Sequence, residues 1–186
     1  MAKITEDEIR LEKHRKMTQT PVPRLVLSMA VPTIISMMVS SIYNMADTFF
    51  MGRINASATA AVGIIFSLMS IIQAAGFFFG HGSGNYISRK LGEKDHKNAS
   101  QMAADGVYLA FAFGIAICVT GLFLLEPLAV FLGATQTILP YAVDYMRIIL
   151  IGAPFITAGF VLNNQLRFQG NAFFAMLGIA SGAVLN

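Results

Sequence analysis

Residues 54–88, INASATAAVGIIFSLMSIIQAAGFFFGHGSGNYIS, form the longest stretch of the chain without a charged side chain. These 35 residues lie between Arg53 and Arg89. A helix needs about 20 predominantly apolar residues to cross the roughly 30 Å hydrocarbon core of a bilayer. The stretch therefore predicts a membrane-spanning helix, and it points to an integral membrane protein of the all-α class.

The composition of the whole chain agrees with this stretch. Of the 186 residues, 55% are apolar and only 12% are charged. A soluble domain of this size leaves roughly a third of its unfolded surface exposed, which such a composition cannot cover. Disorder is excluded by the same apolar content. The net charge of +3 comes without a basic, aromatic-interleaved face, so nucleic acid is not an expected partner.

Further uncharged runs predict a multi-span helical bundle in the lipid bilayer. We divide the chain into an N-terminal arm, residues 1–24, and a transmembrane part, residues 25–186. The expected spans are about 25–50, 57–79, 104–126, 141–163 and a fifth from 172, which is still apolar at residue 186. This last feature predicts that the chain is a fragment of a longer protein.

Lysine and arginine residues predict the orientation of the spans. Positive residues collect on the cytoplasmic side of a membrane protein. One side of the predicted topology has only Arg53 and Arg147. The other side has Lys3, Arg10, Lys13, Arg15, Lys16, Arg24, Arg89, Lys90, Lys94, Lys97 and Arg167. We therefore expect a multi-pass protein of a prokaryotic inner or plasma membrane with a cytoplasmic N-terminus.

Prolines and glycines lie inside the predicted spans. Pro32 and Pro154 each remove a backbone hydrogen bond and bend a helix. Such a bend serves either as a static kink or as a hinge, and the sequence favours neither reading. Small residues four apart allow close helix packing. This spacing is present in two sets, Gly76, Gly80 and Gly84, and Gly178 and Gly182.

Asp47 is the only charged residue between Arg24 and Arg53. An intramembrane carboxylate is costly to bury and commonly marks an ion or substrate path. Burial also raises the pKa of a carboxyl group, which suits it to proton binding. The alternative is a position at the wetted outer end of the helix, since Asp47 lies roughly 33 Å along from Leu25. Tyr43 and Asn44 precede Asp47 by four and three residues, within hydrogen-bonding reach on a helix.

Several motifs, in their order and spacing, resemble the N-terminal lobe of a prokaryotic multidrug and toxic compound extrusion (MATE) transporter. The resemblance covers about residues 20–186. The motifs are Ala30-Val-Pro-Thr-Ile, Tyr43-Asn-Met-Ala-Asp-Thr-Phe-Phe-Met-Gly-Arg53, Ala60-Ala-Val-Gly63, Gly82-Ser-Gly-Asn-Tyr-Ile-Ser-Arg-Lys-Leu-Gly92 and Gln165-Leu-Arg-Phe-Gln-Gly170.

The resemblance implies a twelve-helix transporter of two six-helix lobes, of which this chain would be part of the first. It implies antiport of small cationic or amphipathic compounds against an inward H⁺ or Na⁺ gradient. Asp47 would be the cation-coupling residue, with H⁺ or Na⁺ as its ion, and Pro32 a helix hinge. Tyr43, Asn44 and Asn186 would be supporting polar residues. The C-terminal lobe would be the missing partner, and the chain ends before the second acid expected four residues past Asn186.

Three other functions were weighed against drug export. A lipid-linked oligosaccharide flippase of the same superfamily would be expected to show more basic residues facing its cavity. A small membrane scaffold or channel subunit would fit the glycine faces and the short length, but not the unfinished fifth span. An enzyme would need paired acids, a metal-ligand cluster or a nucleophile with its base, and the sequence shows none of these. We therefore expect no enzymatic activity, no cofactor and no metal site other than Na⁺ at Asp47.

Overall fold

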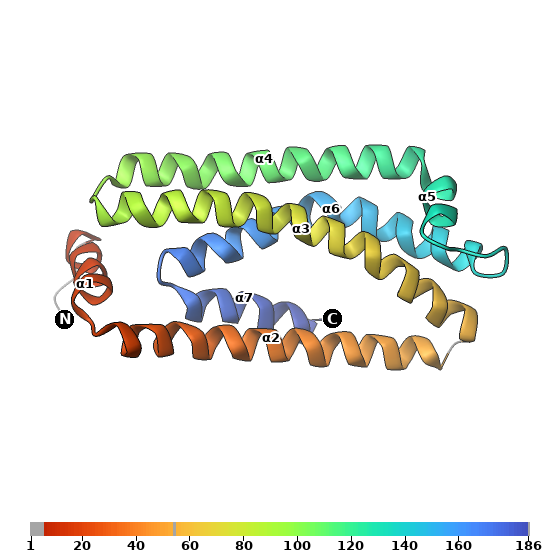
Figure 1. Ribbon diagram of the computed structural model, residues 1–186, viewed down its shortest axis with the longest axis horizontal. Coiled ribbons are helices and arrows are strands. Elements are labelled where there is room, and N and C mark those ends of the chain that lie inside the picture. Colours follow the sequence, from red (N-terminus) through yellow and green to blue (C-terminus); the bar gives the residue numbers. More distant parts are fainter. Residues whose placement is uncertain (1–5, 54, 186) are drawn as a thin grey trace.

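A computed structural model describes residues 6–53 and 55–185 of the chain (Figure 1). The described residues form seven helices joined by short turns. In chain order these are α1 Glu6–Gln19, α2 Val22–Gly52, α3 Ala56–Gly92, α4 His96–Phe123, α5 Leu125–Phe131, α6 Leu139–Phe168 and α7 Ala172–Leu185. Four of them, α2, α3, α4 and α6, are long and apolar enough to cross a membrane. The prediction of an all-α, multi-span protein is confirmed.

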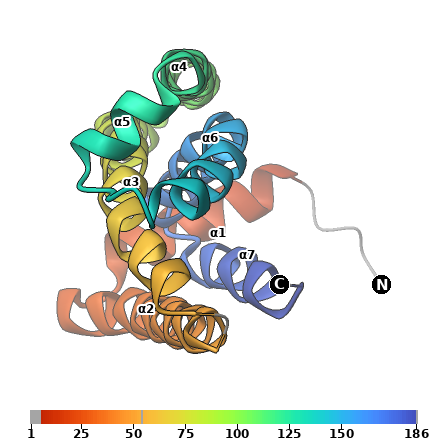
Figure 2. The ribbon, with the colours of Figure 1, turned by 90° about the vertical axis from the view of Figure 1, so that its right-hand side faces the viewer.

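The long helices alternate in direction along the bundle. Figure 1 shows α2, α4 and α7 running one way and α3 and α6 running the other. Viewed from the end, α3, α4 and α6 form one group, while α2 and α7 lie together beside it (Figure 2). The parallel pair α2 and α7 is therefore brought together from opposite ends of the described chain.

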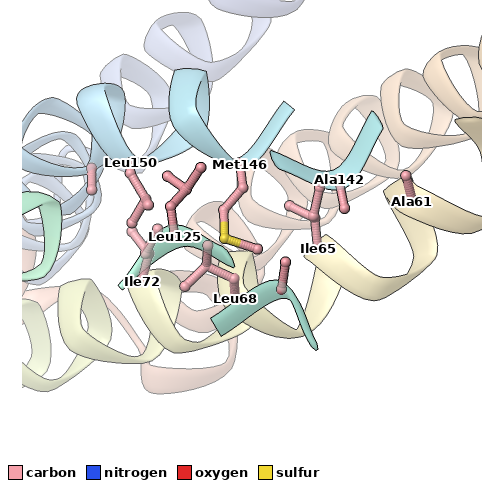
Figure 3. Close-up of a cluster of buried hydrophobic side chains, with 10 residues drawn as sticks. Ala61, Ile65, Leu68, Ile72, Leu125, Ala142, Met146 and Leu150 are labelled. Carbon is pink, nitrogen blue, oxygen red and sulfur yellow. The ribbon is translucent and has the colours of Figure 1, made fainter. Parts of the chain in front are cut away.

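A core of apolar side chains joins α3 to α6, with α5 closing one side (Figure 3). The α3 residues recur every three or four positions, and so do those of α6, which places each set on one helical face. Met146 and Leu150 of α6 are completely buried. The ten core residues are Ala61, Ile65, Leu68, Ile72, Leu125, Ala129, Ala142, Met146, Leu150 and Ala153.

The helices extend beyond the expected spans at several ends. The helix α3 continues from residue 79 to Gly92, so Arg89 and Lys90 lie in its last turn instead of a loop. The next helix begins at an N-cap, Asp95, which accepts hydrogen bonds from the backbone N–H and the side-chain amide of Asn98. Those bonds hold the pKa of Asp95 below its usual range.

The predicted packing of the first glycine set is confirmed. A Cβ at Gly76 would lie 2.6 Å from Cβ of Phe160, and one at Gly80 would lie 3.0 Å from Cβ of Asn164. A Cβ at Gly84 would come too close to the ring of Phe168. The described residues place nothing within 4 Å of a Cβ built at Gly178 or Gly182, so close packing at this second set stays a prediction.

Candidate functional site

The residues predicted to form a cation site lie on α2. Tyr43, Asn44 and Asp47 share one helix, with Asp47 five residues before its last residue, Gly52. Tyr43 is half-buried and Asn44 is exposed, while the side chain of Asp47 lies outside what the structure describes. The helix spacing places Tyr43 one turn from Asp47, as expected. The fourth member of the predicted set, Asn186, lies outside the described residues.

The helix around Pro32 remains continuous. Proline has no N–H to donate, yet α2 runs unbroken from Val22 to Gly52. Two hydroxyl groups hydrogen-bond to carbonyl oxygens of the preceding turn: Thr33 Oγ1 donates to Met29 O at 2.9 Å and buried Ser36 Oγ donates to Pro32 O at 2.8 Å. Side-chain bonds of this kind are associated with bent helices. The role of Pro32 as a hinge stays a prediction.

Helix α2 packs against α7. The two helices run parallel and side by side (Figures 1 and 2). A hydrogen bond of 2.8 Å from Asn163 Nδ2 of α6 to Ala175 O ties α7 to the rest of the bundle. The position of α7 along α2 is therefore linked to α6 through a side chain.

A buried polar cluster between α3, α4 and α6 was not identified from the sequence. Gln165 is 3% exposed, and its Nε2 donates to Ser83 Oγ at 3.0 Å and to Ala103 O at 3.1 Å. Consecutive amides in an otherwise apolar helix, facing a glycine-rich helix, were the available signal. The cluster joins three helices at one point.

Replacing Gln165 by leucine is expected to destabilise the bundle. Leucine has a similar volume but leaves Ala103 O and Ser83 Oγ without the amide donor, which costs about 1–2 kcal/mol of unfolding free energy. Thermal unfolding in detergent, followed with a thiol-reactive dye at Cys118, the one cysteine of the sequence, measures this. Exposed Gln101 on α4 gives the control, Gln101→Leu. Equal midpoints for both variants would contradict the prediction.

Pro154 differs from Pro32 because its surroundings are close-packed. It is buried in α6, and a Cβ at Gly114 of α4 would lie 2.5 Å from its Cα. Thr157 Oγ1 donates to Ala110 O of α4 at 3.0 Å. This contact between two helices favours the static-kink reading for Pro154.

Metal binding by clustered side chains is not indicated in the part of the chain that the structure describes. Those residues include no group of three or more histidine, cysteine, aspartate or glutamate side chains placed to hold an ion.

A bundle of antiparallel apolar helices, with an acid on one long helix and buried amides between others, has the features of a helical membrane transporter. Comparison with known proteins makes this specific. A family model described as MatE matches residues 32–186. The chain belongs to the MatE family, the MATE transporters.

Relatives and solved structures are similar over nearly the whole chain. The Multidrug export protein MepA of Staphylococcus aureus (strain MRSA252) is 27% identical over 90% of this chain and 38% of its own length. MepA of Staphylococcus haemolyticus is 29% identical over 88% of this chain and 36% of its own. The chain thus spans less than two fifths of the length of these relatives.

Two solved structures show the same arrangement of helices. A MOP superfamily transporter from Pyrococcus furiosus is 29% identical, with a TM-score of 0.83 over 99% of this chain and 39% of its own. A MATE in the straight conformation is 28% identical, with a TM-score of 0.85 over 98% of this chain and 39% of its own. The predicted placement of this chain in the N-terminal lobe is confirmed.

Proposed function

We propose that this chain forms part of a secondary active transporter that exports cationic, amphipathic drugs and toxic compounds. The observation that carries the proposal is the family match over residues 32–186, together with relatives named as multidrug export proteins. The same names favour drug export over an oligosaccharide flippase, a scaffold or a channel subunit. Because the chain spans under two fifths of these relatives, export requires a second lobe.

In the proposed mechanism, Asp47 binds H⁺ or Na⁺ and so couples the ion gradient to export. A cation and a positively charged drug both gain from the same negative charge, so binding of one reduces the affinity for the other. Asp47 lies on the same helix as Pro32, and that helix packs against α7, so occupancy of Asp47 could change how α2 packs. The excess of lysine and arginine on one side of the bundle orients that side to the cytoplasm. The end of α2 that carries Asp47 would then face the outside, from which the ion would enter.

The proposal is tested by measuring dye efflux from cells that express the full-length product of the source gene. Cells are loaded with a cationic dye such as ethidium, and its loss is followed by fluorescence. We expect efflux that stops when a protonophore collapses the H⁺ gradient, or when external Na⁺ is replaced by choline. Efflux that survives both treatments would contradict ion coupling, and absence of efflux above vector cells would contradict drug export.

A further inference from the structure

A cavity of about 690 Å³ lies between α1 and the end of the bundle where α3 and α6 finish and α4 begins (Figure 1). The helix α1 contributes four lining residues spaced along one face. The others come from the end of α3, the turn after it, the start of α4 and the end of α6. The cavity is remote from Asp47, which lies near the opposite end of α2.

Part of the cavity lining is apolar. Leu11 and Met17 of α1 and Phe168 of α6 belong to it. Next to it, Gly170 has a φ of +79°, which suits glycine, and a Cβ there would lie 2.7 Å from Met17 Sδ. The turn after α6 therefore leaves space for the Met17 side chain.

The same lining carries basic and imidazole groups. His14 of α1, Lys94 of the turn and His96 of α4 contribute them, and the lining itself includes no carboxylate. Two acids flank Lys94 in the sequence: Glu93 is paired with Lys90 Nζ at 2.7 Å, whereas Asp95 accepts from Asn98 and keeps its charge. An anion would therefore be held by Lys94 together with the two imidazole groups.

The backbone at Lys94 is unusual. Its φ is +61°, the one positive φ of a non-glycine residue in the described chain. This conformation belongs to the C-terminal cap of α3, where Lys94 N–H donates to Leu91 O at 3.1 Å and Asp95 N–H donates to Lys90 O at 2.8 Å. The cap thus holds a lysine where glycine or asparagine would be more stable.

We propose that this cavity binds the phosphate-bearing headgroup of an anionic phospholipid. The phosphate would lie against Lys94, His96 and His14, and the glycerol and upper acyl chain against Leu11, Met17 and Phe168. Two observations favour a lipid over a free phosphate compound. The lining includes the apolar side chains of Leu11, Met17 and Phe168, and the cavity lies near the ends of α3 and α6, two helices long and apolar enough to cross a membrane.

The chain has no tryptophan, which allows a single reporter to test the site. Leu11→Trp places an indole in the cavity lining, and brominated phosphatidylglycerol, titrated into detergent-solubilised protein, quenches it on binding. We expect saturable quenching by phosphatidylglycerol and at least fivefold weaker apparent affinity for brominated phosphatidylcholine. A second reporter, Phe78→Trp on the exposed surface of α3, should be quenched equally by both lipids.

Lys94→Gln, made in the Leu11→Trp background, is expected to weaken phosphatidylglycerol binding about fivefold, since one lysine near anionic lipid has roughly that effect. Lys97→Gln is the matched control, because Lys97 is exposed on α4 and does not line the cavity. Lys94→Arg should retain binding. Circular dichroism and elution volume verify that each variant is folded.

Three results would overturn the proposal. The first is equal quenching by phosphatidylglycerol and phosphatidylcholine at Leu11→Trp. The second is equal loss of binding in Lys94→Gln and Lys97→Gln, which would indicate a general surface charge effect. The third is competition by soluble glycerol 3-phosphate at the concentration of the lipid, which would assign the site to a free phosphate compound. None of these readouts depends on transport.

Discussion

Asp47→Asn in the protein encoded by the whole source gene is expected to reduce gradient-driven dye efflux by at least about tenfold. Asparagine cannot bind a proton or neutralise Na⁺, so the free-energy link between ion and drug, typically 1–3 kcal/mol, is lost. Asparagine nearly matches aspartate in size, so the helix should pack as before. Initial efflux rates, compared at matched protein levels in membranes, measure this loss. Asp47→Glu keeps the carboxylate and should retain part of the efflux.

The matched control for this variant is Asp144→Asn. Asp144 is exposed on α6, near the end of the bundle that also holds the last turns of α2. The same chemical change there should leave efflux unchanged. If Asp47→Asn instead pumps at the unsubstituted rate under the same gradient, Asp47 is an interfacial acid wetted by headgroup water, and coupling belongs to another residue.

Gly114→Val should destabilise the helix bundle by about 3 kcal/mol, the upper part of the usual range for overpacking. A Cβ at Gly114 would lie 2.5 Å from Cα of Pro154, 2.5 Å from Thr157 Oγ1 and 3.0 Å from Ala153 O. Two of these atoms belong to backbone, so no side-chain rotation relieves the overlap. The hydrogen bond from Thr157 Oγ1 to Ala110 O would be broken as α4 and α6 separate.

The thiol-reactive dye at Cys118 measures this variant directly, because Cys118 lies one turn from Gly114 on α4 and is half-buried. The reaction should begin at a lower temperature than in the unsubstituted chain. Gly159→Val on α6 is the control, since nothing lies within 4 Å of a Cβ at Gly159. A melting curve for Gly114→Val that matches this control would show that the close approach is not formed.

The sequence sufficed for the fold class because apolar length is a local property. Uncharged runs identify the spans regardless of how the helices pack. The packing partners were only half predictable. Glycines four apart indicate a contact face, but the sequence does not say which helix fills it. Phe160, Asn164 and Phe168 fill the face of α3, whereas no described residue lies against Gly178 and Gly182.

The sequence could predict which residues belong to the candidate site. It could not predict how the neighbouring helices are arranged around them. Spacing on one helix fixes Tyr43 a turn from Asp47, whereas the approach of α7 to α2 depends on contacts between distant segments. The buried role of Gln165 was missed for the same reason. Its partners Ser83 and Ala103 lie 82 and 62 residues away in sequence.

The contacts at the glycine face of α3 do not by themselves fix the position of α6 along α3. Gly76, Gly80 and Gly84 repeat every four residues, and so do Phe160, Asn164 and Phe168 on the parallel helix α6. Sliding α6 by one turn, about 5.4 Å, would therefore keep two of the three contacts. The bonds from Gln165 to Ser83 and Ala103 have no such repeat. These two hydrogen bonds therefore fix the register of α6 against α3 and α4, because the alternative alignments would break them.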